Sequence, residues 1–333
     1  MNRIILNGIE TIQSKHLLMT GVVNLSIELE LGWGMHDRKK YGHLSSDRSV
    51  ETEALHRLLD LADRLDLPIT FNIVGHLFHD SCSGSHPGPH PESWWTEDPG
   101  TDRDSDPLFY APDLVREIRN RKTDHEFATH TYSHLLAEEA TAEELNDELA
   151  TVDDLHANAG LPSPTSIVMP RHQEPDYSIL VDQDIETIRR PIRGYGLSDS
   201  NPVSTFWWLL TRDHPASTLK RRNGIRETTA TPHPSLTAAS LPAGQSRPHP
   251  LFSVIPRRIR QALHRRYLID AVNRAAVKNT HVHLWTHVYN MVNDGQWGPI
   301  SDGLEYLAER RDQGEILIKR MDELSVPESR GDC

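Results

Sequence analysis

Short apolar runs alternate along this chain with longer segments whose leucines recur every three or four residues. The short runs predict strands over residues 21–31, 68–74, 126–129, 165–169, 185–189, 282–286 and 315–318. The longer segments predict helices over residues 51–65, 142–158 and 301–311, the second of them opened by a capping box at Thr141 and Glu144. Strands that alternate with amphipathic helices indicate an α/β protein with a mainly parallel sheet.

Two long segments follow neither period. Residues 75–107 are rich in His, Pro, Gly, Ser and Asp and contain the adjacent pair Trp94 and Trp95. Adjacent tryptophans are unusual in a disordered linker, so we expect an ordered lid loop over a site. Residues 215–247, rich in Pro, Thr and Ser, are expected to form an irregular insertion. Neither segment marks a domain boundary, and residues 1–333 are interpreted as one elaborated domain.

Composition narrows the class of protein. The chain has 333 residues and a formal net charge of −13, which argues against nucleic-acid binding because little offsets the repulsion from phosphate. Its two cysteines make no disulfide framework, and its N-terminal segment lacks the apolar core of a signal peptide. No stretch approaches the roughly 20 apolar residues that span a bilayer. We expect a cytoplasmic enzyme without stable membrane insertion, and the oligomeric state stays open.

The first predicted strand has one polar face that contains two carboxylates. Alternation puts Leu25, Ile27, Leu29 and Leu31 on one face, and Asn24, Ser26, Glu28 and Glu30 on the other. On pattern alone, the polar face could meet water. It could equally point into a barrel whose outer face lies under helices, and the two carboxylates would then share the barrel mouth.

Histidines cluster at two later positions. His130 and His134 follow a short predicted strand and precede a helix, and the spacing i, i+4 allows both imidazoles to bind one metal ion. Alternation around the strand over residues 282–286 places His281, His283, Trp285 and His287 on one face. A single histidine is usually structural, but three on one face favour a semi-enclosed catalytic setting.

An arginine ends another predicted strand, in the pair Pro170 and Arg171. Arginines at strand ends are often only surface charges. Beside carboxylates, this guanidinium would orient one of them by a bidentate pair and hold it ionised.

These elements, in this order, resemble the motif series of the polysaccharide deacetylase family, the NodB homology domain. In that family an acidic motif ends the first strand, His-(Ser/Thr)-x-x-His follows the third, an arginine motif comes next, and Leu-x-x-His closes the series. The matching segments here are residues 26–30, 130–134, 170–171 and 284–287. The resemblance therefore extends over residues 26–287, most of the chain.

The resemblance implies a distorted (β/α)7 barrel of the TIM-like type, with its active site at the carboxyl ends of the strands. It also implies a divalent metal ion, usually zinc (Zn²⁺), held by one carboxylate and two histidines. Carried onto this sequence, the metal ligands are Glu30, His130 and His134.

Three further residues take catalytic roles by the same resemblance. Glu28 would be the general base, Arg171 would orient it, and His287 would be the general acid. The implied reaction is hydrolysis of an N-acetyl group on a sugar of a glycan or glycan precursor, with release of acetate. Glu28 stands where the family usually has aspartate, and its extra methylene moves the carboxylate by roughly 1.5 Å.

Two other functions remain open. One is a catalytically silent member that binds metal or glycan, which the longer side chain of Glu28 and the pair Trp94 and Trp95 motivate. The other is hydrolysis of a small cyclic imide or amide, which is the kind of substrate that some relatives of this fold use. That activity would require a narrow, enclosed mouth, whereas a glycan requires an open groove.

Two remaining features are interpreted as structural. Cys82, His86 and His90 fit no standard spacing of a structural zinc site, so a histidine-rich loop is the favoured interpretation. The basic cluster over residues 256–266 is interpreted as the solvated face of a helix.

Overall fold

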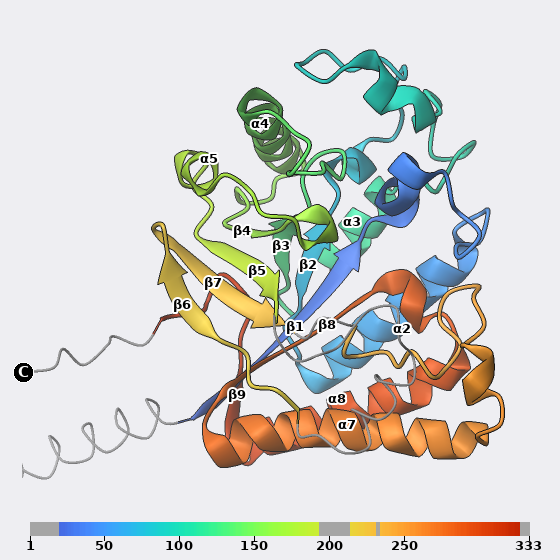
Figure 1. Ribbon diagram of the computed structural model, residues 1–333, viewed down its shortest axis with the longest axis vertical. Coiled ribbons are helices and arrows are strands. Elements are labelled where there is room, and N and C mark those ends of the chain that lie inside the picture. The colour runs from blue at the N-terminus through green and yellow to red at the C-terminus, as the bar shows by residue number, and fades with distance from the viewer. Residues whose placement is uncertain (1–19, 193–213, 231–233, 327–333) are drawn as a thin grey trace, which may run out of the picture.

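A mostly parallel sheet organises the protein, and the computed structural model describes residues 20–192, 214–230 and 234–326 (Figure 1). The strands in these ranges are β1 (Gly21–Leu29), β2 (Thr70–Ile73), β3 (Glu126–Thr129), β4 (Ser166–Val168), β5 (Thr187–Pro191), β6 (Leu219–Arg222), β7 (Ile225–Ala230), β8 (His281–His287) and β9 (Ile316–Ile318). Their order is β6-β7-β5-β4-β3-β2-β1-β8, with β9 beside β1. Among these described strands, only β6 runs antiparallel to its neighbour. The predicted α/β class with a parallel sheet is confirmed.

Helices cover the sheet and link its strands. The α-helices are α2 (Ser49–Leu65), α3 (Pro112–Arg119), α4 (Ala142–Asn158), α5 (Tyr177–Asp182), α7 (Arg257–Lys278) and α8 (Asp294–Asp312). Short 3₁₀ helices are η1 (Leu31–Arg38), η2 (Gly75–Phe78), η3 (Glu92–Glu97), η4 (Pro170–His172), η5 (Pro250–Phe252) and η6 (Val288–Met291). In Figure 1, α2, α7 and α8 lie below the strands, and α4 and α5 lie above them. No helix in the described ranges is long and apolar enough to cross a bilayer.

The predicted start of α4 is confirmed in detail. The hydroxyl of Thr141 accepts a hydrogen bond from the backbone N–H of Glu144 at 3.2 Å. The carboxylate of Glu144 accepts one in return from the backbone N–H of Thr141 at 2.6 Å. This capping box satisfies two backbone donors that the helix itself leaves unpaired.

The two ends of the sheet approach each other without a continuous ladder. Ser217 forms an isolated bridge with His281 of β8, and the hydroxyl of Thr228 lies 3.2 Å from Nδ1 of His283. Over the described residues the sheet is therefore a distorted barrel that is not closed. It also has more strands than the expected seven, because β6 and β7 add a hairpin.

The hairpin β6–β7 lies within the stretch that we expected to be an irregular insertion. For residues 219–230 that prediction is wrong, and β7 extends the sheet by pairing with β5. Asn223 (φ 50°) and Gly224 (φ 90°) form the connecting turn. An Asn-Gly pair favours this left-handed turn, whose twist matches that of a hairpin, so the dipeptide was the signal to use.

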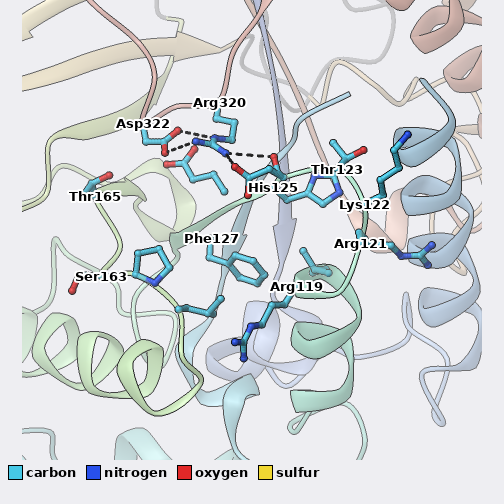
Figure 2. A pocket seen from close by; sticks show the side chains of 15 residues that line it. Arg119, Arg121, Lys122, Thr123, His125, Phe127, Ser163, Thr165, Arg320 and Asp322 are labelled. Carbon is cyan, nitrogen blue, oxygen red and sulfur yellow. Dashed lines mark hydrogen bonds and ion pairs between the residues drawn. The ribbon is translucent and has the colours of Figure 1, made fainter. Parts of the chain in front are cut away.

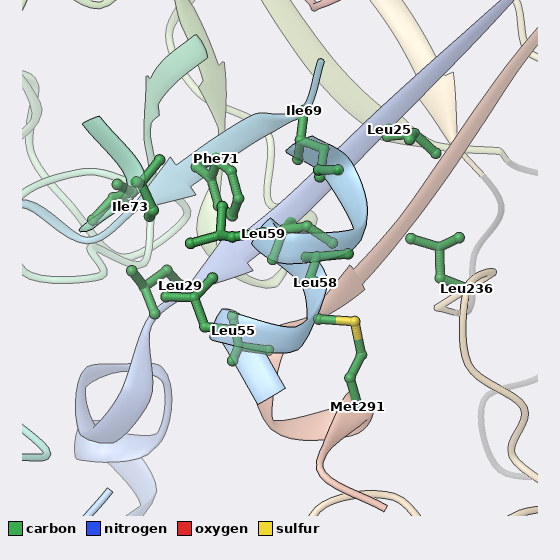
Figure 3. Close-up of a cluster of buried hydrophobic side chains, with 14 of the residues drawn as sticks. Leu25, Leu29, Leu55, Leu58, Leu59, Ile69, Phe71, Ile73, Leu236 and Met291 are labelled. Atoms are coloured by element: carbon green, nitrogen blue, oxygen red, sulfur yellow. The ribbon is translucent and has the colours of Figure 1, made fainter. Parts of the chain in front are cut away.

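The apolar core lies between the barrel and α2 (Figure 3). Leu25 and Leu29 project from β1 toward Leu55 and Leu58 of α2, and each is at most 1% exposed. The opposite face of β1 is buried as well, with Asn24, Ser26, Glu28 and Glu30 all at 5% exposure or less. Both faces are covered, so the polar face of β1 points into the barrel, and the barrel interpretation of its pattern is confirmed.

Glu126 begins β3 at the end of the strand opposite to His130. It borders a cavity of about 410 Å³, which Figure 2 shows between His125, Phe127 and Arg320. Its Oε2 accepts hydrogen bonds from the hydroxyl of Thr70 at 2.6 Å and the backbone N–H of residue 321 at 2.8 Å. Burial, aided by the charge of a nearby aspartate, raises the pKa of the Glu126 carboxyl to about 7.

This raised pKa predicts a pH-dependent stability. The unfolded chain ionises the Glu126 carboxyl near its ordinary pKa, whereas the folded protein holds the proton until about pH 7. The free energy of unfolding should therefore fall by up to about 3 kcal/mol as the pH rises through this interval. Urea unfolding at about pH 5 and about pH 8 measures the slope, and Glu126→Gln should flatten it. Equal slopes in the two proteins would contradict the assignment to Glu126.

Candidate active site

The strand ends meet at a cavity of about 380 Å³ at the mouth of the barrel. All six residues that the resemblance singled out line this cavity: Glu28, Glu30, His130, His134, Arg171 and His287. Glu28 is the last but one residue of β1, and Glu30 is the single residue between β1 and η1. The parallel strands place these distant positions together because their carboxyl ends share one edge.

The histidine motif after β3 is a tight loop, although its i, i+4 spacing is also that of a helical turn. Thr131 and His134 both have φ of 61°, in the left-handed region, and α4 begins only at Ala142. The loop is held by buried Glu148 of α4, whose carboxylate accepts hydrogen bonds from the backbone N–H of Ser133 (2.8 Å) and from its hydroxyl. The loop, rather than a helix face, therefore brings the two histidine rings together, with centroids 5.1 Å apart.

Three side chains offer donors that fit one divalent ion. Ligand atoms of Glu30, His130 and His134 all lie within 4.8 Å of one another. Nδ1 of His130 donates to the carbonyl of Val168 at 2.6 Å, which fixes the ring tautomer and leaves the lone pair of Nε2 facing the carboxylates. Burial lowers the pKa of His134 and so favours the neutral form that binds metals. The donor set matches a site with one carboxylate, two imidazoles and open positions.

Glu28 is paired with an arginine that the sequence analysis missed. Arg189 of β5, fully buried, donates through Nη2 to Oε1 of Glu28 and through Nη1 to the hydroxyl of Ser26 at 2.9 Å. Its guanidinium also lies over the ring of Trp285, 4.4 Å from the centroid. Burial raises the pKa of Glu28, but the charges of Arg189 and His287 outweigh it and hold that pKa well below its usual range.

Arg171, expected to orient Glu28, has a different partner. Its Nη2 lies 2.5 Å from Oδ1 of Asp37 and donates to the carbonyl of Gly34 at 3.3 Å. Arg171 sits beyond the end of β4, in η4, and so reaches the rim formed by η1. Arg189 lies inside the barrel, level with Glu28. The signal for it was a charged residue within the predicted strand over residues 185–189.

His287 lies between the two glutamates. Its Nε2 is 2.9 Å from Oε2 of Glu28 and 2.9 Å from Oε1 of Glu30. Burial would lower the pKa of His287, but the two carboxylates outweigh burial and raise it to about 10. Tyr289 stacks on the ring at a centroid distance of 4.7 Å. The imidazole is therefore held protonated and positioned at the cavity wall.

The other histidines of β8 are interior structural residues. His283 is fully buried, and its Nε2 lies 2.8 Å from the hydroxyl of Ser26. His281 contacts the side-chain oxygen of Asn24 through Nε2. Neither lines the cavity, so of the three histidines on this face only His287 belongs to the site.

Residues 75–107, expected as a lid, lie beside the histidine motif. None of the residues in this segment, all of which the structure describes, lines the cavity. Trp94 donates through Nε1 to the hydroxyl of Ser133 at 2.7 Å, and its ring packs edge-on against His36 at 4.7 Å. The segment therefore braces the loop that carries the histidines, instead of covering the cavity.

Comparisons with known proteins identify a family match and a shared fold. The family model for polysaccharide deacetylase matches residues 36–187, a range that includes His130, His134 and Arg171 and leaves the two glutamates and His287 outside. No curated protein sequence matches the chain.

Solved structures share the fold at low sequence identity. A protein assigned as a polysaccharide deacetylase from Mycobacterium smegmatis is 14% identical, with a TM-score of 0.51 over 93% of this chain and 95% of the other. One from Pseudomonas aeruginosa PAO1 is 10% identical, with a TM-score of 0.55 over 91% and 88%. Puue allantoinase is 11% identical, with a TM-score of 0.54 over the same shares. The family model thus identifies residues 36–187 as a polysaccharide deacetylase domain.

Proposed function

We propose that the protein is a metal-dependent deacetylase that hydrolyses an N-acetyl group on a sugar of a glycan or glycan precursor and releases acetate. The match of residues 36–187 to the polysaccharide deacetylase family supports deacetylation of such groups. The observation that carries the proposal is the single cavity in which Glu30, His130 and His134 lie beside Glu28 and His287.

Zinc is the proposed ion, because one carboxylate and two imidazoles are the donors typical of catalytic zinc sites. An ion held by Glu30, His130 and His134 would lower the pKa of water and polarise the acetamide carbonyl. The carbonyl of Val168 supports this role, since it fixes the ring of His130 with Nε2 toward the cavity.

The proton transfers fall to two residues of the chain. Glu28 is held ionised by Arg189, so it can accept the proton of the attacking water. Nε2 of His287 lies 2.9 Å from Oε2 of Glu28, whose charge favours the protonated imidazole, so His287 can donate a proton to the departing amine. An amine leaves poorly unless it is protonated, and positioned acid–base residues of this kind contribute about 10²–10⁴-fold to a rate.

A catalytically silent member is the first alternative, because Glu28 replaces the usual aspartate. The contacts of Glu28 favour activity. Its longer side chain places one carboxylate oxygen against Arg189 and the other 2.9 Å from His287. The extra methylene is thus accommodated without separating the base from its neighbours.

Hydrolysis of a small cyclic imide or amide is the second alternative, which the shared fold of Puue allantoinase makes worth testing. The cavity of about 380 Å³ is near the lower end of the range for small-ligand sites, roughly 300–1,000 Å³. Acetate release from N-acetylglucosamine oligomers should therefore be compared with ring opening of allantoin. Loss of acetate release with a chelator and its recovery with zinc would support the proposal. A metal-loaded protein inactive on both substrates would favour the silent alternative.

Metal analysis distinguishes the proposed ligands from a competing set. Glu28, Glu30 and His287 also bring ligand atoms within 4.8 Å of one another. If Glu30, His130 and His134 hold the ion, His130→Ala should lose one metal ion per chain relative to the parent, and His287→Ala should keep it. Elemental analysis of both variants after dialysis provides the measurement. The opposite pattern would assign the ion to the competing set.

A further inference from the structure

A second group of metal-binding side chains lies outside the catalytic cavity. The ligand atoms of His76, Cys82, His86 and Asp98 all lie within 4.8 Å of one another. Oδ2 of Asp98 is 3.1 Å from Sγ of Cys82, 3.3 Å from Nε2 of His76 and 2.5 Å from Nε2 of His86. Tetrahedral zinc, with bonds of about 2.0–2.3 Å, separates its ligand atoms by roughly 3.3–3.8 Å. Small side-chain adjustments would bring these four atoms to that spacing.

This grouping corrects the interpretation from sequence. The spacing of Cys82, His86 and His90 matched no structural zinc site, because two ligands come from elsewhere and one of these three is not a ligand. His90 pairs with Glu148 at 2.9 Å and stacks on Trp94. The missing members are His76, in η2 and six positions before Cys82, and Asp98, just after η3 and 12 positions beyond His86.

The ring of His76 is oriented as a metal ligand. Its Nδ1 lies 3.2 Å from the carbonyl of Phe109, a group that can only accept, so Nδ1 carries the hydrogen. A neutral ring then turns the lone pair of Nε2 toward the carboxylate of Asp98, whose Oδ2 lies 3.3 Å away. A lone pair facing a carboxylate is unfavourable unless a proton or a cation lies between them. Ligand histidines usually donate their other ring nitrogen to a carbonyl in this way.

Two glycines direct backbone N–H groups at the other ligands. Gly84 donates to Sγ of Cys82 at 3.3 Å, and Gly100 donates to Oδ1 of Asp98 at 3.1 Å. Both have positive φ, 72° and 60°, a conformation that side chains rarely adopt. A Cβ on Gly84 would lie 3.2 Å from Cα of Gly100, so the two turns also pack closely together. Such N–H donors stabilise a thiolate and a carboxylate, the anionic forms that bind a metal.

We propose that His76, Cys82, His86 and Asp98 bind one zinc ion in a closed structural site. Four protein ligands leave no position for water or substrate, which is typical of structural zinc sites. A thiolate ligand favours zinc over magnesium or calcium. The thiolate and the carboxylate together balance the charge of the ion, and the side chains of His76 and Asp98 are fully buried.

The ion would fasten residues 82–98 to the loop that carries the catalytic histidines. His76 N donates to the carbonyl of Tyr132 at 2.8 Å, and the hydroxyl of Tyr132 lies 3.1 Å from Nδ1 of His86. Tyr132 lies between His130 and His134 in the chain, so the proposed site contacts the loop that carries the catalytic histidines.

Cobalt spectroscopy tests the site without reference to enzyme activity. Chelator-treated protein loaded with Co²⁺ should show a near-ultraviolet thiolate-to-cobalt charge-transfer band. The catalytic cavity is lined by no cysteine among the described residues, so it cannot produce that band. Cys82→Ser should abolish the band and lower zinc content by one ion per chain, whereas the matched control His90→Ala should keep both. Cys333→Ser should also keep the band and so exclude the other thiol of the chain.

The parent protein alone can overturn the proposal, so the test does not depend on folding of the variants. Absence of the charge-transfer band from the parent protein at saturating Co²⁺ would show a hydrogen-bonded cluster without an ion. Failure of the catalytic proposal would instead appear as unchanged metal content in His130→Ala, which leaves the thiolate band intact. The two proposals can therefore fail separately.

Discussion

Glu28→Gln is expected to lower kcat for acetate release by about 10²–10⁴-fold while the protein keeps its fold and its metal. Glutamine preserves the shape of the side chain and can still accept a hydrogen bond from Arg189. It cannot accept a proton from water, because its amide is not basic. KM should change little, since Glu28 acts on the water and not on the sugar. Steady-state kinetics and metal analysis of the same preparation provide the measurement.

Glu28→Asp is the matched control for this prediction. It keeps the charge and restores the residue usual in the family, but it withdraws the carboxylate by roughly 1.5 Å from Arg189 and His287. Misplacement on that scale can cost about 10²-fold in rate, so an intermediate kcat is expected. Full activity of Glu28→Gln would remove Glu28 from the mechanism, and the base would then have to be sought among the other residues of the cavity.

Most strands could be predicted because burial on both faces leaves a strong pattern. The prediction for residues 126–129 matches β3, and the alternation of β1 correctly allowed an inward polar face. The hairpin β6–β7 was missed because β6 is largely exposed and polar, with the sequence Leu-Lys-Arg-Arg. Its only clear signal was the turn pair Asn223 and Gly224. Apolar periodicity cannot reveal a strand that buries little.

The site was predictable where a local motif holds the residues and unpredictable where only the fold does. His130 and His134 are four positions apart, and the structure brings their rings together. Arg189 reaches Glu28 from 161 positions away, and its place within a predicted strand did not identify Glu28 as its partner. The cluster around Asp98 was missed for a different reason, because His76 and Cys82 are only six positions apart but their spacing matches no standard zinc motif. Spacing along the chain predicts only contacts within one turn or loop. Contacts between residues that are distant in sequence depend on the topology of the fold.

Arg189→Leu is expected to destabilise the protein by about 3–5 kcal/mol, because it leaves the carboxylate of Glu28 buried without its arginine partner. It should also move the acidic limb of the pH–rate profile to higher pH. The reason is that the charge of Arg189 lowers the pKa of Glu28, so its removal raises that pKa. At a pH below this pKa, the carboxylate of Glu28 is protonated and cannot act as a base. Denaturant unfolding and a pH series of kcat/KM measure the two effects.

Arg171→Leu is the matched control, since the sequence had assigned that arginine to Glu28. Its partner, Asp37, and its own guanidinium are partly exposed, so its loss should cost only about 0–1 kcal/mol and leave the acidic limb in place. Arg189→Lys retains a charge without the planar fork, and we expect it to fold even if Arg189→Leu does not, with a smaller shift of the limb. A shift in Arg171→Leu and none in Arg189→Lys or Arg189→Leu would return the positioning role to Arg171. The expected result would instead show that the guanidinium holding the base comes from inside the barrel, on β5.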